Sequence, residues 1–433
     1  MAIRNKIKKV IANQNLKFFL TLLSGSAIAQ GIVFLITPVL SRVYTDEMFG
    51  TLTLFSSITL TLSTVVALRY ELSILLPKRE KDAVSLLILC FIIITVLSLV
   101  TLFIIILYHE FFNGLFDNGG LGRFIFLLPL GVFLHGMFNT LTYWLNRQKK
   151  FKSISFVRIN KSISMSSVQL INGFSALQYL GLIPGLIAGQ LMGFLHTIYS
   201  ASKSIRRNAH HISINRILLL AKRYQKIPKY NTLLTFTNTL SNELPNILIP
   251  KYFGLAIGGQ FGLAVRLIKT PIGLISEAVS QIFFNKASET YNNEPSRFHE
   301  LVKQTYIKLF FLALTGFPLL FVSTYFFEYI LGSEWTETGI YSRLLIPWLF
   351  LMFLNSPISS LIVILGKQRS LVIYDLLLLL LRLTALILGY HYFYNIIYVL
   401  VLYSMVGMIF NSFLIFYFIK LSKQADQEHK YGR

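Results

Sequence analysis

Charged side chains recur at helical spacing within segments that are otherwise apolar. In residues 257–284, Arg266, Lys269 and Glu277 fall within one sector of an α-helix. A charge at the centre of a membrane helix costs about 2.5–3.5 kcal/mol on insertion scales. We therefore expect these three side chains to face protein or water. Two cations beside one carboxylate favour the binding of an anion.

Other apolar segments carry charges in the same way. Arg158 and Lys161 lie about one turn apart in residues 153–176, and Asp375 and Arg382 share a face in residues 371–391. Away from the ends of the apolar segments, the remaining charges are Arg69, Glu71 and Glu243. The excess of cations over acids predicts a hydrated, net cationic cavity formed by segments from both halves of the chain.

We predict two roles for these side chains. The predicted substrate-binding residues are Arg266, Lys269, Arg69, Arg158, Lys161 and Arg382. The predicted residues for charge balance or ion coupling are Glu277, Asp375, Glu71 and Glu243. Two alternatives stay open: cations near helix ends extend to the lipid headgroups, or the acids and cations form purely structural ion pairs.

Several kinds of chemistry are excluded by what the sequence lacks. No Gly-x-x-x-x-Gly-Lys-Ser/Thr loop occurs, so ATP hydrolysis by that route is excluded. The single cysteine, Cys90, cannot form a disulfide within the chain, and the eight histidines are scattered. We therefore predict no catalytic residue, no metal and no cofactor, and a transporter rather than an enzyme.

The elements that carry these charges are apolar runs long enough to cross a membrane. A helix needs about 20 residues to span about 30 Å of hydrocarbon. The predicted spans are roughly 18–41, 49–76, 83–107, 124–145, 153–176, 178–200, 230–252, 257–284, 305–331, 340–366, 371–391 and 395–420. The fold class is therefore an all-α polytopic membrane protein with about 12 transmembrane helices.

The distribution of basic residues predicts the orientation of these helices. The chain has 40 Lys and Arg against 18 Asp and Glu, a net charge of +22. With the N-terminus inside, the inner segments carry 30 Lys and Arg and the outer loops carry four. This asymmetry predicts that both termini are cytoplasmic. The cations lie beside apolar spans, which favours contact with anionic membrane lipids over nucleic acid.

A weak internal repeat predicts two halves. Phe49 and Gly50 follow Pro38 at the same spacing as Phe261 and Gly262 follow Pro250, an offset of 212 residues. We predict six-helix lobes at 1–200 and 230–420, a basic cytoplasmic linker at 201–229, and a cytoplasmic tail at 421–433. An even number of spans per half implies a pseudo-two-fold axis along the membrane normal.

Four segments of the chain resemble a known family. They are PVLSRVYTDEMFGTLTLFSSITLTLSTVVALRYELSILLP from Pro38, YWLNRQKKFKSIS from Tyr143, KRYQKIPKYN from Lys222 and GQFGLAVRLIKTPIGLISEAVSQIFFNKASE from Gly259. In order and spacing they resemble bacterial O-antigen and polysaccharide flippases of the MATE-like superfamily, over most of the chain.

This resemblance implies a function and a location. It implies a two-lobed transporter in the bacterial inner membrane. The transporter would move an undecaprenyl-diphosphate-linked oligosaccharide from the cytoplasmic to the periplasmic leaflet by alternating access. The partners it implies are the polyprenyl-diphosphate-linked glycan, membrane lipids and other polysaccharide assembly proteins. A diphosphate needs cationic partners, which agrees with the predicted cavity.

Three alternatives are weighed against the flippase. A cation-coupled drug exporter of the same superfamily generally uses carboxylates in its N-terminal lobe, and the first span here has none. A peptidoglycan-precursor flippase usually has more spans. A membrane polysaccharide polymerase would be an enzyme, with a large external loop or a catalytic histidine in a polar motif; here His135 and His196 stand alone.

Overall fold

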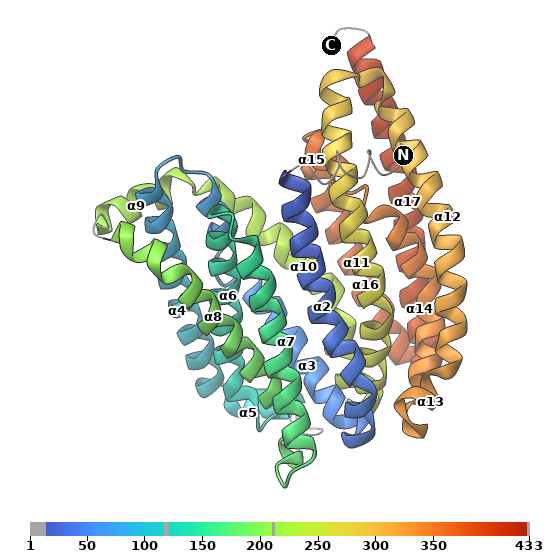
Figure 1. The fold of residues 1–433 in the computed structure, drawn as a ribbon. Helices are drawn as coiled ribbons and strands as arrows, with labels where there is room; N and C mark the ends of the chain where they lie inside the picture. Colours follow the sequence, from blue (N-terminus) through green and yellow to red (C-terminus); the bar gives the residue numbers. More distant parts are fainter. Residues whose placement is uncertain (1–13, 117–120, 210–212, 431–433) are drawn as a thin grey trace, which may run out of the picture. The chain divides into compact units, whose positions relative to one another are not determined.

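The protein consists mainly of long helices. The computed structural model describes residues 14–116, 121–209 and 213–430 (Figure 1). No strand occurs among these described residues. Eight described helices are long and apolar enough to cross a membrane. The predicted all-α polytopic membrane fold is confirmed.

The chain divides into two compact units. Unit 1 comprises residues 1–243 and 254–259, and unit 2 comprises residues 244–253 and 260–433. The division falls within the helices α10 (Lys226–Phe253) and α11 (Leu255–Asn293) rather than at the basic segment 201–229. The lobes predicted from the internal repeat stay a prediction.

The helices of unit 1 are α2 (Gln14–Val43), α3 (Asp46–Ser63), α4 (Glu80–Leu107), α5 (His109–Phe116), α6 (Leu128–Arg147), α7 (Phe151–Gly173), α8 (Ile183–Ala209), α9 (Ile214–Arg223) and most of α10. Those of unit 2 are most of α11, then α12 (Phe298–Ser323), α13 (Phe327–Leu331), α14 (Thr336–Asn355), α15 (Leu361–Ile364), α16 (Gln368–Phe393) and α17 (Ile396–Lys430). Four predicted spans correspond to α3, α7, α8 and α10, which carry more polar side chains than the eight apolar helices.

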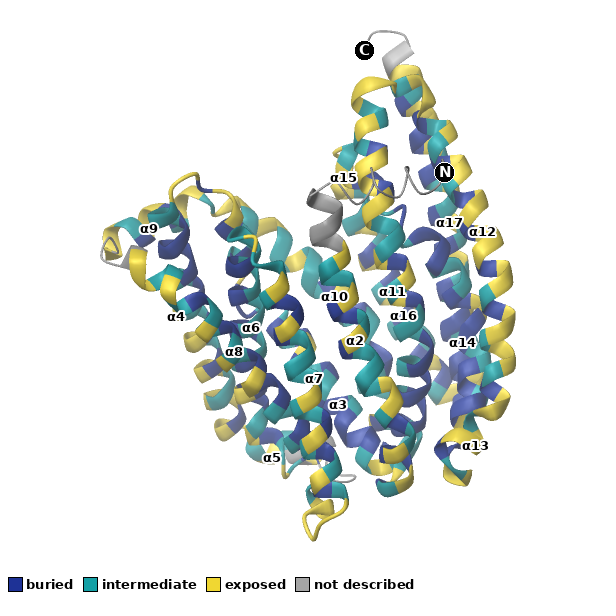
Figure 2. Ribbon diagram, viewed as in Figure 1, coloured by how far each residue is buried: buried dark blue, intermediate teal, exposed yellow. Residues whose placement is uncertain are grey.

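Exposed apolar side chains lie along the outer faces of the long helices. In Figure 2 exposed positions recur along α4 and α12. They include Leu99 and Phe103 on α4 and Phe311 and Leu319 on α12. Water does not stabilise such faces, whereas the hydrocarbon of a bilayer does.

Glycine allows α7 and α8 to pack closely in unit 1. Gly185, Gly189 and Gly193 recur every four residues on one face of α8. A Cβ on Gly189 would lie 2.9 Å from the carbonyl oxygen of Lys161 and 2.8 Å from the Cβ of Met165. Only glycine therefore permits this approach, which fixes the position of the α7 backbone that carries Lys161.

The predicted span 49–76 is wrong as a continuous helix. α3 ends at Ser63, and a short 3₁₀ helix, η1, follows at Tyr70–Leu75. Between them Leu68 and Arg69 adopt left-handed conformations, with φ of 48° and 60°. Such conformations are strained for residues other than glycine and persist only where the surroundings enforce them.

The basic segment 201–229 is largely helical in its described part. It contains the end of α8, the whole of α9 and the start of α10. On α9, Ile217 and Leu220 are buried, and Arg216 forms an ion pair of 2.5 Å with Asp82 at the start of α4. The Tyr70 hydroxyl donates to the carbonyl oxygen of Ala221, at 3.1 Å. These contacts attach α9 to the rest of unit 1.

Candidate functional site

Among the described residues of unit 2, the most buried cation lies against two adjacent aromatic rings. The Arg382 guanidinium carbon lies 4.8 Å from the ring centroid of Trp348 and 4.8 Å from that of Tyr403. Lys269 Nζ lies 5.1 Å from the Trp348 ring. We call these four residues the Trp348 cluster. A desolvated cation over an aromatic face gains about 2 kcal/mol, so the rings stabilise charges that are out of water.

Four helices of unit 2 position the Trp348 cluster. Lys269 comes from α11, Trp348 from α14, Arg382 from α16 and Tyr403 from α17. The Trp348 and Tyr403 rings pack edge to face, with centroids 5.3 Å apart and planes at 84°. Arg382 is only 2% exposed.

A glycine makes room for the indole. A Cβ on Gly407 of α17 would lie 2.3 Å from Cδ1 of Trp348. A contact that short does not occur between side chains, so any other residue would push the ring away from its place. Gly407 is therefore a positioning residue for the Trp348 cluster.

Two predicted acids and one predicted cation lie near this cluster in sequence. Asp375 is on α16, seven residues before Arg382, and is 9% exposed. Arg266 is half-buried on α11, one turn before Lys269. Glu277 is exposed and lies eight residues beyond Lys269, which places it about 12 Å along the helix. The predicted stripe on α11 thus divides into a half-buried cationic part and an exposed acid.

The cations of α7 form a second group, in unit 1. The Arg158 guanidinium donates to the Ser26 hydroxyl of α2. Lys161 Nζ lies 4.8 Å from the ring centroid of Phe138 on α6. Both side chains thus contact protein groups of unit 1, and their role in substrate binding stays a prediction.

Arg69 forms an ion pair on the strained segment between α3 and η1. Its Nη1 lies 3.0 Å from Oε1 of Glu71, and the two side chains are 20% and 6% exposed. Glu71 Oε2 and Arg69 Nε are buried and make no hydrogen bond. A buried ion pair with unsatisfied atoms costs desolvation energy that its own attraction only partly offsets.

The remaining predicted acid bridges two helices of unit 1. The Ser57 hydroxyl of α3 donates to Glu243 Oε2 of α10, at 2.7 Å. Among the described residues, no group of three or more His, Cys, Asp and Glu side chains could hold a metal ion.

The structure brings some predicted residues together and adds others. It joins Lys269 with Arg382, and Arg69 with Glu71. Sequence reasoning missed Trp348 and Tyr403, whose positions beside the cations depend on the packing of four helices. A tryptophan in the interior of a predicted span is the one sequence signal for the site, since most membrane tryptophans lie at the interfaces.

Comparisons with known proteins agree with this architecture. Residues 72–339 match the model of a protein family described as Polysaccharide biosynthesis protein. No curated protein matches the chain.

Solved structures share the fold. An inward-facing multidrug resistance MATE family transporter of the MOP superfamily is similar with a TM-score of 0.75 and 12% identity, over 94% of this chain and 96% of that one. Lipid II flippase MurJ, in an inward closed conformation, is similar with a TM-score of 0.70 and 16% identity, over 95% of this chain and 90% of that one. A variant of the Vibrio cholerae MATE transporter VcmN is similar with a TM-score of 0.61 and 13% identity, over 98% of both chains.

Proposed function

Because the chain belongs to the polysaccharide biosynthesis protein family and has the fold of MOP superfamily transporters, we propose that it is a flippase for lipid-linked glycans. The proposed substrate is an oligosaccharide repeat unit of a surface polysaccharide, such as O-antigen, carried on undecaprenyl diphosphate. The proposed direction is from the cytoplasmic to the periplasmic leaflet of a bacterial inner membrane, by alternating access. The transport needs no catalytic residue.

The observation that carries this proposal is the Trp348 cluster. It holds Lys269 and Arg382 against aromatic rings within helices that are apolar enough to span a membrane. A diphosphate is a compact anion that cationic side chains recognise by charge-assisted hydrogen bonds. Movement of each negative charge outward is favoured by about 2.3 kcal/mol per 100 mV when the cell interior is negative.

The acids support a second part of the proposal. Asp375 lies on the same face of α16 as Arg382, and Glu71 pairs with Arg69 at a strained break. Buried carboxylates within transporters are sites for charge balance or proton movement. We propose these roles for Asp375 and Glu71.

A cation-coupled exporter of drugs or metabolites is the second candidate. The likeness of fold to a multidrug resistance MATE family transporter favours it. The excess of cations among the charges of the predicted spans favours an anionic substrate instead, which distinguishes the flippase from an exporter of cationic drugs.

An assay of the leaflet in which repeat units accumulate tests the proposal. Cells that lack the protein are expected to accumulate lipid-linked units on the cytoplasmic face, and the wild-type chain is expected to relieve this. Single units collecting on the outer face would indicate a polymerase. Unchanged lipid-linked units with altered drug sensitivity would indicate an exporter.

A further inference from the structure

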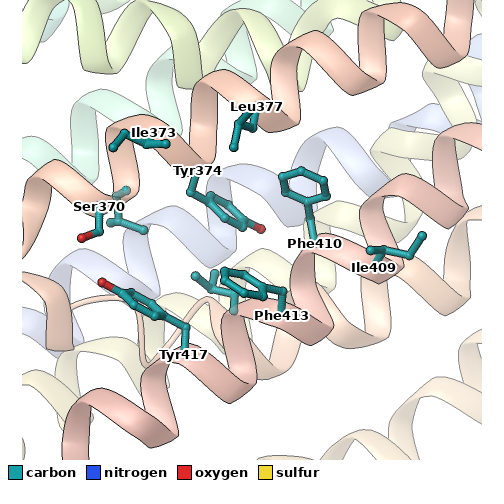
Figure 3. Close-up of a pocket in the computed structure, with 10 residues that line it drawn as sticks. Ser370, Ile373, Tyr374, Leu377, Ile409, Phe410, Phe413 and Tyr417 are labelled. Carbon is teal, nitrogen blue, oxygen red and sulfur yellow. The ribbon is translucent and has the colours of Figure 1, made fainter. Parts of the chain in front are cut away.

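An apolar cavity of about 510 Å³ lies between α16 and α17 of unit 2. Its lining includes Tyr374 and Leu377 from α16 and Ile409, Phe410, Phe413 and Tyr417 from α17. Figure 3 shows the four aromatic side chains gathered around the space between the two helices. The volume is within the range of about 300–1,000 Å³ that is usual for ligand sites. We call this cavity the α16–α17 groove.

The groove opens toward hydrocarbon. Leu377 is 50% exposed, Ile409 66% and Phe413 60%, and both helices are apolar enough to span a membrane. Within a bilayer such a surface is covered by lipid chains rather than by water. The occupant that suits the groove is therefore a hydrocarbon chain.

Three cations lie at one end of the groove. Lys367 and Arg369 flank the first residue of α16, and Ser370 lines the cavity one residue later. On α17, Lys420 follows the lining residue Tyr417 by three residues. All three cations are exposed. They are complementary to a phosphate group, and the N-terminus of α16 adds favourable dipole charge.

The antiparallel arrangement brings these cations to the same level. α16 ends at Phe393, and α17 starts at Ile396 after a turn at Tyr394 in the left-handed conformation. Equal lengths counted from this turn place Lys420 level with Arg369, because each lies 24 residues from the end of its helix at the turn. The groove is thus apolar along its length and cationic at the end predicted to be cytoplasmic.

We propose that the α16–α17 groove binds the chain of a polyprenyl diphosphate in the cytoplasmic leaflet, with the diphosphate beside Lys367, Arg369 and Lys420. This inference rests on the proposed function and specifies where the lipid part of the substrate is held. Three cations suit a diphosphate better than the single phosphate of a bilayer phospholipid. The four aromatic faces pack well against the methyl-branched, unsaturated units of a polyprenyl chain.

The groove is separate from the Trp348 cluster. None of the four residues of the Trp348 cluster lines the groove. At about 100° per residue, the buried side chains of Asp375 and Arg382 point about 120° around α16 from those of Tyr374 and Leu377. The groove with its three cations and the Trp348 cluster are therefore separate sites, and the inference concerns the site where the lipid and its diphosphate are held in the cytoplasmic leaflet.

Binding of undecaprenyl diphosphate to the purified full chain tests this inference. The protein is placed in nanodiscs of phosphatidylethanolamine and phosphatidylglycerol, and bound undecaprenyl diphosphate is measured by native mass spectrometry. Leu377→Trp fills the groove, and a Lys367→Gln, Arg369→Gln, Lys420→Gln variant removes its cations. Each is expected to weaken binding at least roughly tenfold, equivalent to about 1.4 kcal/mol.

Matched controls carry the same changes elsewhere. Leu380→Trp adds the same bulk at an exposed position of α16 that does not line the groove. A Lys286→Gln, Lys303→Gln, Lys308→Gln variant removes three exposed cations from α11 and α12. Both controls are expected to bind as the wild type does. Folding is checked for every variant by its elution as a single species.

Three results would overturn the inference. The first is unchanged binding of undecaprenyl diphosphate by the Leu377→Trp variant. The second is that undecaprenol, which lacks the diphosphate, binds as tightly. The third is that phosphatidylglycerol displaces bound undecaprenyl diphosphate as well as undecaprenyl diphosphate itself does, which would indicate a site for bilayer lipid. If the wild-type protein restores polysaccharide export and the groove variants bind undecaprenyl diphosphate as the wild type does, the inference fails but the proposed function stands. If wild-type protein binds no undecaprenyl diphosphate and its loss leaves lipid-linked units unchanged, the proposed function fails as well.

Discussion

At the scale of single residues, aromatic rings and one glycine determine where the buried charges lie. The Trp348 indole contacts both Lys269 and Arg382, and Gly407 leaves the space that the indole occupies. The cations are thus held in fixed positions before any ligand arrives. Such preorganisation lowers the cost of binding a charged group.

Replacing Gly407 by alanine is expected to displace the indole and impair transport. Overpacking of this kind costs about 1–3 kcal/mol of stability. Polysaccharide export and thermal unfolding of the purified protein are the measurements. Gly316→Ala on α12 is the control, because no atom lies within 4 Å of its added Cβ. Equal behaviour of the two variants would contradict a positioning role for Gly407.

Replacing Glu71 by glutamine is expected to destabilise unit 1. The change leaves the Arg69 charge without its carboxylate in a place where Arg69 is only 20% exposed. Loss of one partner of a buried pair costs about 3 kcal/mol. Thermal unfolding in detergent checks this against Glu294→Gln, which breaks an exposed pair with Arg297 and should cost less than about 1 kcal/mol. A similar loss in both variants would disagree with this account.

The sequence predicts which residues are charged within the membrane but not how they are neutralised. Hydropathy identifies Lys269 and Arg382 because charge in an apolar segment is costly wherever it points. Their common partner Trp348 could not be predicted, since its contacts depend on the shapes of side chains from four helices. Glu277 shows the limit of helical spacing as a predictor. It shares a helical sector with Arg266 and Lys269, yet its side chain is exposed whereas theirs are half-buried.

At the scale of elements, close helix packing and a broken helix shape unit 1. α7 and α8 pack closely because three glycines of α8 are spaced four residues apart, a pattern that is visible in the sequence. The break between α3 and η1 has no such signal. Residues 64–69 contain neither glycine nor proline, so their departure from a helix reflects tertiary contacts. One such contact is that of Arg147 Nη1 with the Ile74 carbonyl, at 3.1 Å.

Alanine at Gly189 is expected to separate α7 from α8. The added Cβ would lie 2.9 Å from the Lys161 carbonyl oxygen, and the backbone cannot yield cheaply. A loss of about 1–3 kcal/mol of stability follows, with less folded protein in the membrane. Gly31→Ala on α2 is the matched change, since nothing lies within 4 Å of its Cβ. Equal amounts of folded protein in the two variants would refute close α7–α8 packing.

At the scale of the whole molecule, the distribution of charge predicts the orientation in the membrane. Basic residues gather in alternate segments, which predicts cytoplasmic termini by the positive-inside rule. The predicted fold was accessible from sequence because spans of about 20 apolar residues are the strongest signal that a chain carries. The boundary between the two units within α10 could not be read from the sequence, because it depends on which residues contact each other in the folded protein.

Cysteine labelling tests the orientation. The one native cysteine, Cys90, is buried and can be replaced by alanine. Glu334→Cys, in an exposed position before α14, is expected to react with a membrane-impermeant maleimide on intact spheroplasts. Gln427→Cys, near the end of α17, is expected to react only after the membrane is opened. The opposite pattern would reverse the predicted topology.

The most direct test of the central claim is transport in reconstituted vesicles. Purified protein is placed in proteoliposomes with a fluorescent undecaprenyl-diphosphate-linked sugar, and movement between leaflets is followed by quenching with dithionite. Wild-type protein is predicted to move the labelled lipid, and a Lys269→Gln, Arg382→Gln variant at the same protein level is predicted to be at least roughly tenfold slower, a change of about 1.4 kcal/mol in barrier height. Equal rates for both proteins would contradict the role of the Trp348 cluster, and no movement with the wild type would contradict the proposed flippase.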